Sequence, residues 1–160
     1  MSSTLFLETS LGNIVLRLKP NSAPRTVEHI KKLASDGLYD GCCFYRSDFV
    51  IQCGLQRPDG SGVRNPHVPL EVNETTVNER VSNKRGTVSV AHWDVPDCGN
   101  SEFFINVQDN PHLDTAYGGY CVFAEVAGDD SYRNVDAIKS AILSGVKPLI
   151  RKAYIINANY

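Results

Sequence analysis

Two stretches of the chain bring an arginine and a glutamine together with several aromatic side chains. The first reads FYRSDFVIQCG at residues 44–54, and the second reads NSEFFIN at residues 100–106. Both are typical of short β-strands, in which successive side chains point to opposite faces. We therefore expect several aromatic rings to lie beside Arg46 and Gln52. This combination suits a binding site and includes no obvious nucleophile.

Nucleophilic catalysis and metal binding are poorly supported by the sequence. There is no Gly-x-Ser-x-Gly elbow, and no serine or cysteine stands in the context of an activated nucleophile. The four histidines lack the spacing of a metal motif; they are His29, His67, His92 and His112. We expect no metal and no other cofactor, and we expect His29 to be a solvated helix residue.

The composition indicates one globular domain. A chain of 160 residues can bury a core without metals or disulfides, so we expect a single domain over residues 1–160, and a monomer. A net charge of -2 and a pI near 6.1 give no basic surface for nucleic acid or an anionic membrane. Five cysteines without a Cys-x-x-Cys pair favour reduced thiols. With no basic-then-apolar leader at the start, the expected location is the cytoplasm, with the nucleus as the alternative.

The hydrophobic patterns predict a mainly β fold. Apolar and polar residues alternate at residues 4–8 and 13–18, which predicts a β-hairpin. Ser22 as an N-cap candidate, Pro24 and an apolar stripe predict a helix that ends at Gly37. Other strands are expected at residues 86–91, 103–107, 121–126 and 150–157, with a second helix near residues 134–144. Many short strands with two helices favour a closed barrel, and the long polar loop at residues 56–85 should border the site.

The motifs named above resemble those of the cyclophilins, which are peptidyl-prolyl cis-trans isomerases. The matching family segments are Phe-His-Arg, Phe-Met-Ile-Gln-Gly-Gly and Ser-Gln-Phe-Phe-Ile, and the likeness covers nearly the whole chain. The resemblance implies a closed eight-stranded antiparallel β-barrel capped by two α-helices. It also implies isomerisation of Xaa-Pro bonds in protein clients, which assists folding and needs no cofactor. Residues 119–126 are similar to bacterial-type members, and residues 110–114 to small cyclophilin-like proteins associated with spliceosomes.

The resemblance also implies a role for individual residues. Arg46 matches the catalytic arginine, and Gln52 matches the glutamine that supports it and hydrogen-bonds substrate. The implied substrate-binding residues are Phe49, Val50, Phe103 and Leu113 around the proline ring, Ala91 and His92 along the peptide, and Glu102, His112 and Tyr120, with Phe104 facing the core. Because His112 stands where other members have Trp, we expect only weak binding of cyclosporin.

Several positions depart from the family motifs. The segment between Arg46 and Phe49 is two residues shorter than usual, which puts the position of Phe49 in question. Tyr45 replaces the usual His, and Glu102 replaces Gln. Glu102 is expected either to disfavour acidic residues beside the proline or to point into solvent. The alternative function is therefore a proline-peptide binding module or assembly scaffold, for example spliceosome-associated, with weak or lost turnover.

Overall fold

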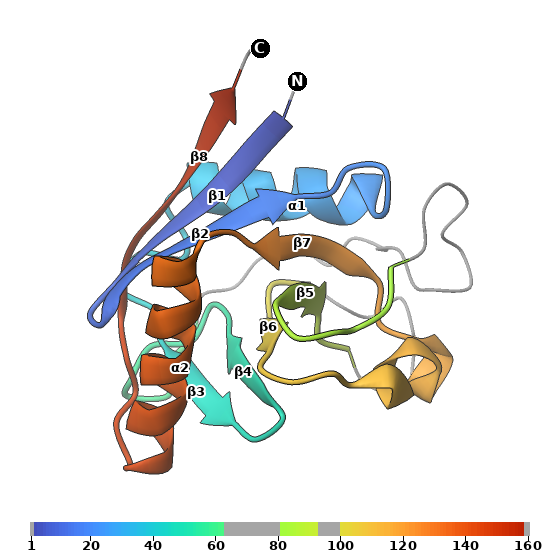
Figure 1. Cartoon of the computed structure of the whole chain (residues 1–160). Helices are drawn as coiled ribbons and strands as arrows, with labels where there is room; N and C mark the ends of the chain where they lie inside the picture. Colours follow the sequence, from blue (N-terminus) through green and yellow to red (C-terminus); the bar gives the residue numbers. More distant parts are fainter. Residues whose placement is uncertain (1, 63–80, 93–99, 159–160) are drawn as a thin grey trace.

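The computed structural model describes residues 2–62, 81–92 and 100–158. These residues form eight β-strands, two α-helices and two short 3₁₀ helices (Figure 1). In chain order they are β1 (Ser2–Thr9), β2 (Gly12–Leu18), α1 (Pro24–Ser35), β3 (Phe44–Ser47), β4 (Val50–Cys53), β5 (Thr87–Val90), β6 (Phe103–Asn106), η2 (Pro111–Asp114), η3 (Ala116–Gly118), β7 (Val122–Val126), α2 (Asp129–Leu143) and β8 (Ile150–Ala158). The predicted β-rich fold and all the predicted elements are confirmed.

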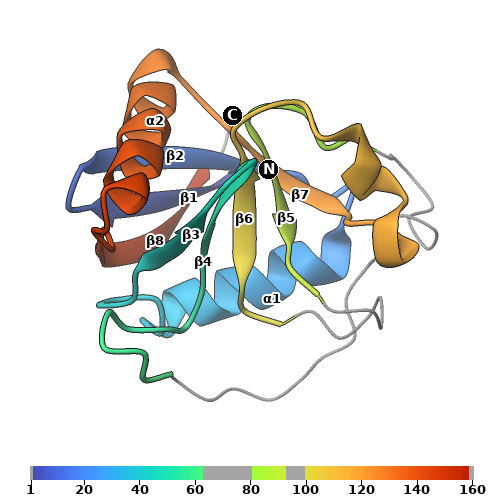
Figure 2. The same ribbon diagram turned by 90° about the horizontal axis from the view of Figure 1, so that it is seen from below.

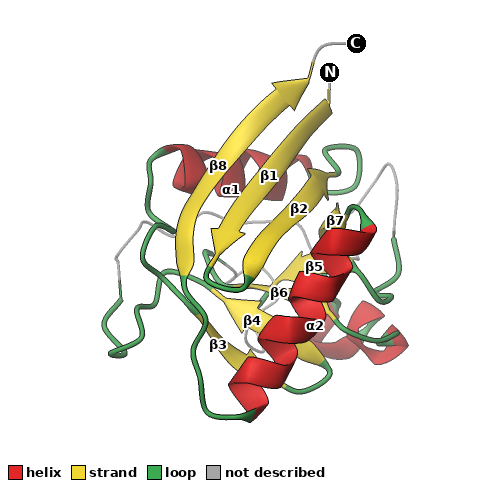
Figure 3. Ribbon diagram, turned by 60° about the vertical axis from the view of Figure 1, so that its left-hand side comes forward, coloured by secondary structure: helices red, strands yellow, loops and turns green. Residues whose placement is uncertain are grey.

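The strands form one curled antiparallel sheet in the order β3-β4-β6-β5-β7-β2-β1-β8 (Figure 3). The prediction of a closed barrel is wrong, since the described residues form an open half-barrel. Among the described residues, the two edge strands, β3 and β8, form no ladder with each other. The segments that lead into them meet at an isolated bridge between Cys43 and Leu149, flanked by backbone hydrogen bonds from Phe44 N to Pro148 O and from Ile150 N to Cys42 O. This contact precedes the first residue of either strand, and β3 has only four residues. The edges therefore diverge before a ladder can form.

The two helices lie apart on the curled sheet (Figures 1 and 2). Helix α1 buries the predicted stripe, with Val27, Ile30 and Leu33 turned inward. Its N-cap is Ala23 rather than Ser22, and Pro24 follows it at the first helical position, where a missing N–H costs nothing.

Helix α2 begins at Asp129, five residues before the predicted start at residue 134. Its first turn carries the acidic side chains of Asp129 and Asp130, which favour a helix N-terminus but contribute no apolar stripe. Periodicity alone therefore places the start of this helix too late.

The central strands β4 and β6 carry apolar side chains on both faces, and β5 carries them on one face. One face joins the main core through Ile51 and Cys53 of β4, Phe103 and Ile105 of β6, and Val88 and Val90 of β5. The other face carries Val50 of β4 and Phe104 of β6, which form a second cluster with Leu113 of η2. This alternation follows from the two-residue period of a strand, and it places the second cluster on the side of the sheet away from the main core.

Four cysteines, Cys42, Cys43, Cys53 and Cys121, are buried free thiols, as predicted, whereas Cys98 lies outside the described residues. Burial is the main cause that raises the pKa of the Cys53 thiol, which makes it a poor nucleophile. His67 also lies outside the described residues. Among the helices of the described ranges, none is both long and apolar enough to cross a bilayer.

Candidate active site

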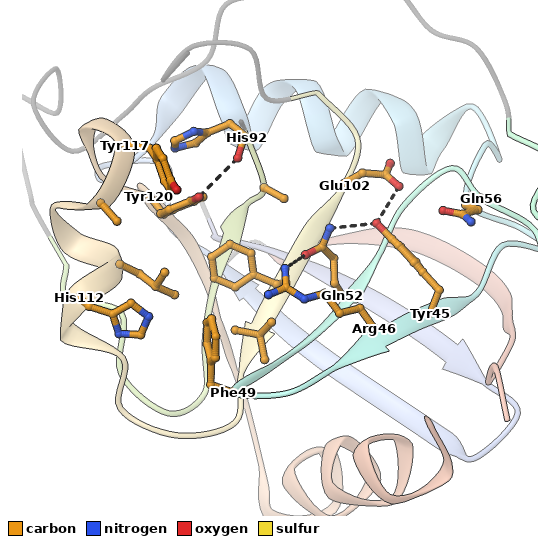
Figure 4. A pocket seen from close by; sticks show the side chains of 15 residues that line it. Tyr45, Arg46, Phe49, Gln52, Gln56, His92, Glu102, His112, Tyr117 and Tyr120 are labelled. Carbon is orange, nitrogen blue, oxygen red and sulfur yellow. Dashed lines mark hydrogen bonds between the residues drawn. The ribbon is translucent and has the colours of Figure 1, made fainter. Parts of the chain in front are cut away.

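A cavity of about 550 Å³ opens over the second cluster (Figure 4). Ten of the eleven predicted site residues line it, and Phe103 does not. The lining consists of Tyr45, Arg46, Phe49, Val50, Gln52, Gln56, Ala91, His92, Glu102, Phe104, His112, Leu113, Ala116, Tyr117 and Tyr120. A cavity of this size that mixes apolar walls with a few polar groups is typical of a ligand site.

The positions predicted for Phe103 and Phe104 are exchanged. Phe103 is 0% exposed and packs in the main core between Tyr39 and Phe123. Phe104 lines the cavity instead. The reason is strand register: Phe104 pairs with Gln52, and Phe103 pairs with Cys53. Glu102 and Phe103 are adjacent, so alternation prevents both from facing the cavity.

A β-bulge brings Tyr45 and Arg46 to the cavity together. Phe44 pairs with Cys53 and Arg46 with Gln52, so that β3 has one extra residue, Tyr45, against its partner β4. In a regular strand, neighbours 45 and 46 would point to opposite faces. Bulges re-aim side chains in this way next to functional sites, and here both residues line the cavity.

Arg46 is held by hydrogen bonds from two directions. Its Nε and Nη2 donate to Asp48 Oδ2 at 3.0 and 2.8 Å, and its Nη1 donates to Gln52 Oε1 at 3.1 Å. These bonds occupy three of the five N–H groups of a guanidinium. The side chain is 48% exposed, so the ion pair with Asp48 is worth at most about 1 kcal/mol. Its main effect is to orient Arg46.

The shortened turn between β3 and β4 leaves Phe49 in the cavity. The Phe49 backbone carbonyl accepts hydrogen bonds from Asn110 Nδ2 at 3.0 Å and from Val107 N at 3.3 Å. The ring packs edge-on against His112, with centroids 5.1 Å apart. The Arg46 guanidinium lies 5.6 Å from the centre of the same ring. The shorter turn therefore does not displace Phe49 from the cavity, where Val107, Asn110 and His112 contact it.

The apolar floor of the cavity is made by Val50, Phe104 and Leu113, with half-buried Phe49, Ala91 and Tyr120 packed against them. The Tyr120 ring meets the edge of Phe104 at 5.5 Å and stacks on His92 at 4.1 Å. Tyr120 Oη donates to the backbone carbonyl of His92 at 3.4 Å. The floor of the cavity is thus apolar, and the polar groups of Arg46 and Gln52 lie at one side of it (Figure 4).

A buried amide anchors this floor from behind. Asn83 is 0% exposed, and its Nδ2 donates to Asp114 Oδ1 at 2.8 Å and to the carbonyl of Tyr120 at 3.0 Å. Its Oδ1 accepts from Ser89 Oγ at 2.8 Å and from Asn106 Nδ2 at 3.2 Å. Asn83 comes from the loop at residues 56–85 that was expected to border the site; residues 63–80 of this loop lie outside the described residues. It fixes η2 and Tyr120 against β5 and β6.

Glu102 faces the cavity with both carboxylate oxygens hydrogen-bonded. Oε1 accepts from Tyr45 Oη at 3.0 Å, and Oε2 accepts from Ser101 Oγ at 2.7 Å and from Leu55 N at 3.1 Å. A Cβ at Gly54 would lie 1.9 Å from Glu102 Oε2, so this carboxylate requires a glycine beside it. Glu102 is half-buried and does not simply point into solvent.

Comparison with known proteins identifies the family. The family model described as cyclophilin type peptidyl-prolyl cis-trans isomerase/CLD matches residues 4–159. The chain belongs to the cyclophilin family. It is 41% identical over 145 residues to the peptidyl-prolyl cis-trans isomerase cyp18 of Streptomyces antibioticus, covering 86% of this chain and 83% of that protein. It is 36% identical over 138 residues to peptidyl-prolyl cis-trans isomerase B of Escherichia coli, covering 82% and 80%.

Solved cyclophilin structures share the fold. The chain superposes with a TM-score of 0.73 on a cyclophilin type isomerase of Cryptosporidium parvum that was crystallised in the presence of the dipeptide Ala-Pro. The two sequences are 17% identical, and the match covers 97% of this chain and 99% of the other. At this level of identity the superposition bears on the fold alone.

Within this cyclophilin, the cavity includes residues that were not predicted from the motifs: Tyr45, Gln56, Phe104, Ala116 and Tyr117. For Phe104 the signal was available, because it shares a strand face with Glu102. For Tyr45 it was not, since the bulge depends on pairing with β4. Tyr117 has a left-handed backbone (φ 52) and is 62% exposed, which motif matching does not detect.

Proposed function

We propose that this cyclophilin accelerates cis-trans rotation of Xaa-Pro bonds in peptides and proteins, with Arg46 as the catalytic residue. The observation that carries the proposal is the position of the Arg46 guanidinium, fixed by Asp48 and Gln52 at the side of an apolar cavity. No group of this site needs to form a covalent bond with the substrate.

Prolyl rotation is slow because amide resonance must be lost, at a barrier of about 18–20 kcal/mol. In the twisted transition state the prolyl nitrogen becomes pyramidal and regains a lone pair. A donor aimed at that nitrogen stabilises the twisted state more than either planar ground state. A guanidinium suits this role because it stays charged and its planar group is already oriented.

The remaining predicted residues have complementary roles in the proposal. The proline ring would pack on Phe49, Val50, Leu113 and Phe104, the last in place of Phe103. Backbone groups of residues 91–92 would bind the peptide, with His112 and Tyr120 at the rim and Glu102 beside the residue before proline. Gln52 would bind substrate while holding Arg46 through its Oε1.

The proposal also covers the ligands, the oligomeric state and the location of the protein. The ligands are proline-containing peptides, without a cofactor, nucleic acid or membrane, and cyclosporin is a weak ligand. The chain acts as a single-domain monomer, in the cytoplasm or the nucleus.

The direct test is exchange NMR of a short Ala-Pro peptide with the wild-type chain and with Arg46→Ala. We expect saturable acceleration by the wild type and a loss of about 10²–10³-fold in Arg46→Ala, the effect of removing one preorganised donor. Peptide affinity should change far less. Arg46→Lys should rescue little, because an ammonium group cannot reproduce the planar fork.

The alternative function, a proline-peptide binding module, predicts a different result. The wild-type chain would bind the peptide without accelerating its exchange. Undiminished catalysis by Arg46→Ala would instead show that another group stabilises the twisted amide.

A further inference from the structure

Two positions that depart from the family motifs contact one another in the folded chain. Tyr45 and Glu102 are 57 residues apart, and Tyr45 Oη donates to Glu102 Oε1 at 3.0 Å. Tyr45 Oη also accepts from Gln52 Nε2 at 2.9 Å, and Gln52 Oε1 accepts from Arg46 Nη1 at 3.1 Å. A continuous chain of hydrogen bonds thus runs from Glu102 to Arg46 (Figure 4).

The donor-to-acceptor direction of this series of hydrogen bonds is set at both of its ends. An ionised carboxylate only accepts hydrogen bonds, and a guanidinium only donates them. Tyr45 must therefore donate its single hydroxyl proton to Glu102, which leaves its oxygen to accept from Gln52. The Gln52 amide then has one orientation that satisfies both neighbours, with Nε2 toward Tyr45 and Oε1 toward Arg46.

Glu102, at one end of this series of hydrogen bonds, is itself held in place. Glu102 Oε2 accepts from Leu55 N and Ser101 Oγ, and the carboxylate packs against Gly54. Burial and the neighbouring charge of Glu102 raise the pKa of the Tyr45 phenol, so it stays protonated and can donate. Glutamine at 102 could not serve both sides, because its one oxygen would be needed by Leu55 N–H as well as by Tyr45.

We propose that Tyr45 and Glu102 are positioning residues that fix the amide of Gln52 and, through it, the guanidinium of Arg46. The proposal rests on the isomerase function of Arg46. It assigns to the two departures a joint role in orienting the catalytic group, in which the hydrogen bonds of Tyr45 and Glu102 reach the Arg46 guanidinium through Gln52.

The kinetic test is a double-mutant cycle on kcat/KM for an Ala-Pro peptide, with peptide affinity measured separately. We expect Tyr45→Phe to lower kcat/KM about three- to tenfold, as for the loss of one internal hydrogen bond, with affinity nearly unchanged. In a Gln52→Ala background, Tyr45→Phe should cost nothing further, because the link to Arg46 is already cut. Glu102→Gln should lower kcat/KM by a similar factor, and less in the Tyr45→Phe background.

A matched control is Tyr154→Phe on β8, which makes the same chemical change outside the cavity and should leave kcat/KM unaltered. A second measurement does not depend on turnover: ¹H–¹⁵N spectra of the Gln52 side-chain amide and Arg46 Nε. Tyr45→Phe should shift both signals, and Tyr154→Phe neither.

Multiplicative effects of Tyr45→Phe and Gln52→Ala would overturn the proposal, as would full activity of Tyr45→Phe with unshifted Arg46 and Gln52 signals. A wild-type chain that fails to accelerate exchange would refute the isomerase function, and the spectra would still decide whether the chain of hydrogen bonds orients Arg46.

Discussion

Replacing Asn83 with alanine should destabilise the protein and loosen the floor of the active site at once. The buried Asn83 amide makes four hydrogen bonds, two of them fully buried, that join β5, β6, η2 and the Tyr120 carbonyl. Each is worth about 1 kcal/mol net, and more where the partner is charged, as at Asp114. Asn106 keeps Thr87 as a partner, and Asp114 keeps the backbone N–H of residue 83. The loss should therefore be below the sum, at about 2–3 kcal/mol.

The measurement is chemical and thermal unfolding, with the affinity for an Ala-Pro peptide measured alongside. For a chain of this size, a loss of 2–3 kcal/mol corresponds to a fall in Tm of about 5–10 °C. Peptide affinity should fall several-fold because Leu113 and Tyr120 lose their anchor. The matched control is Asn157→Ala, an exposed asparagine on β8 bonded to Ser3, which should change stability by no more than about 0.5 kcal/mol. An Asn83→Ala protein as stable as this control would refute the reasoning.

Two further predictions concern ligand preference. Glu102 at the cavity wall should disfavour Glu-Pro relative to Ala-Pro peptides, because like charges in a partly dry groove repel; Glu102→Gln should bring the two kcat/KM values closer together, and an unchanged ratio would mean that Glu102 does not read the substrate. Cyclosporin should bind more tightly to His112→Trp than to the wild type, because an indole offers a larger apolar face and an N–H donor; equal dissociation constants in a calorimetric titration would contradict this.

The predicted elements and much of the site followed from local patterns in the sequence. Alternating residues located β1, β2 and the central strands, and the apolar stripe located α1, because side-chain periodicity depends only on backbone geometry. Arg46, Gln52 and Leu113 belong to short motifs, so their meeting in one cavity could be anticipated. The start of α2 could not, since its first turn is acidic.

Tertiary structure decided which neighbours face the cavity. A shift of one residue in strand register exchanges the two faces, and register is set by pairing between distant segments: β4 with β6 puts Phe104, not Phe103, beside Gln52. The bulge that turns Tyr45 toward Glu102 arises from the pairing of β3 with β4. The open sheet likewise reflects how far β3 and β8 run together. Local sequence determines that side chains alternate along each strand, but only pairing between distant segments determines which of them face the cavity.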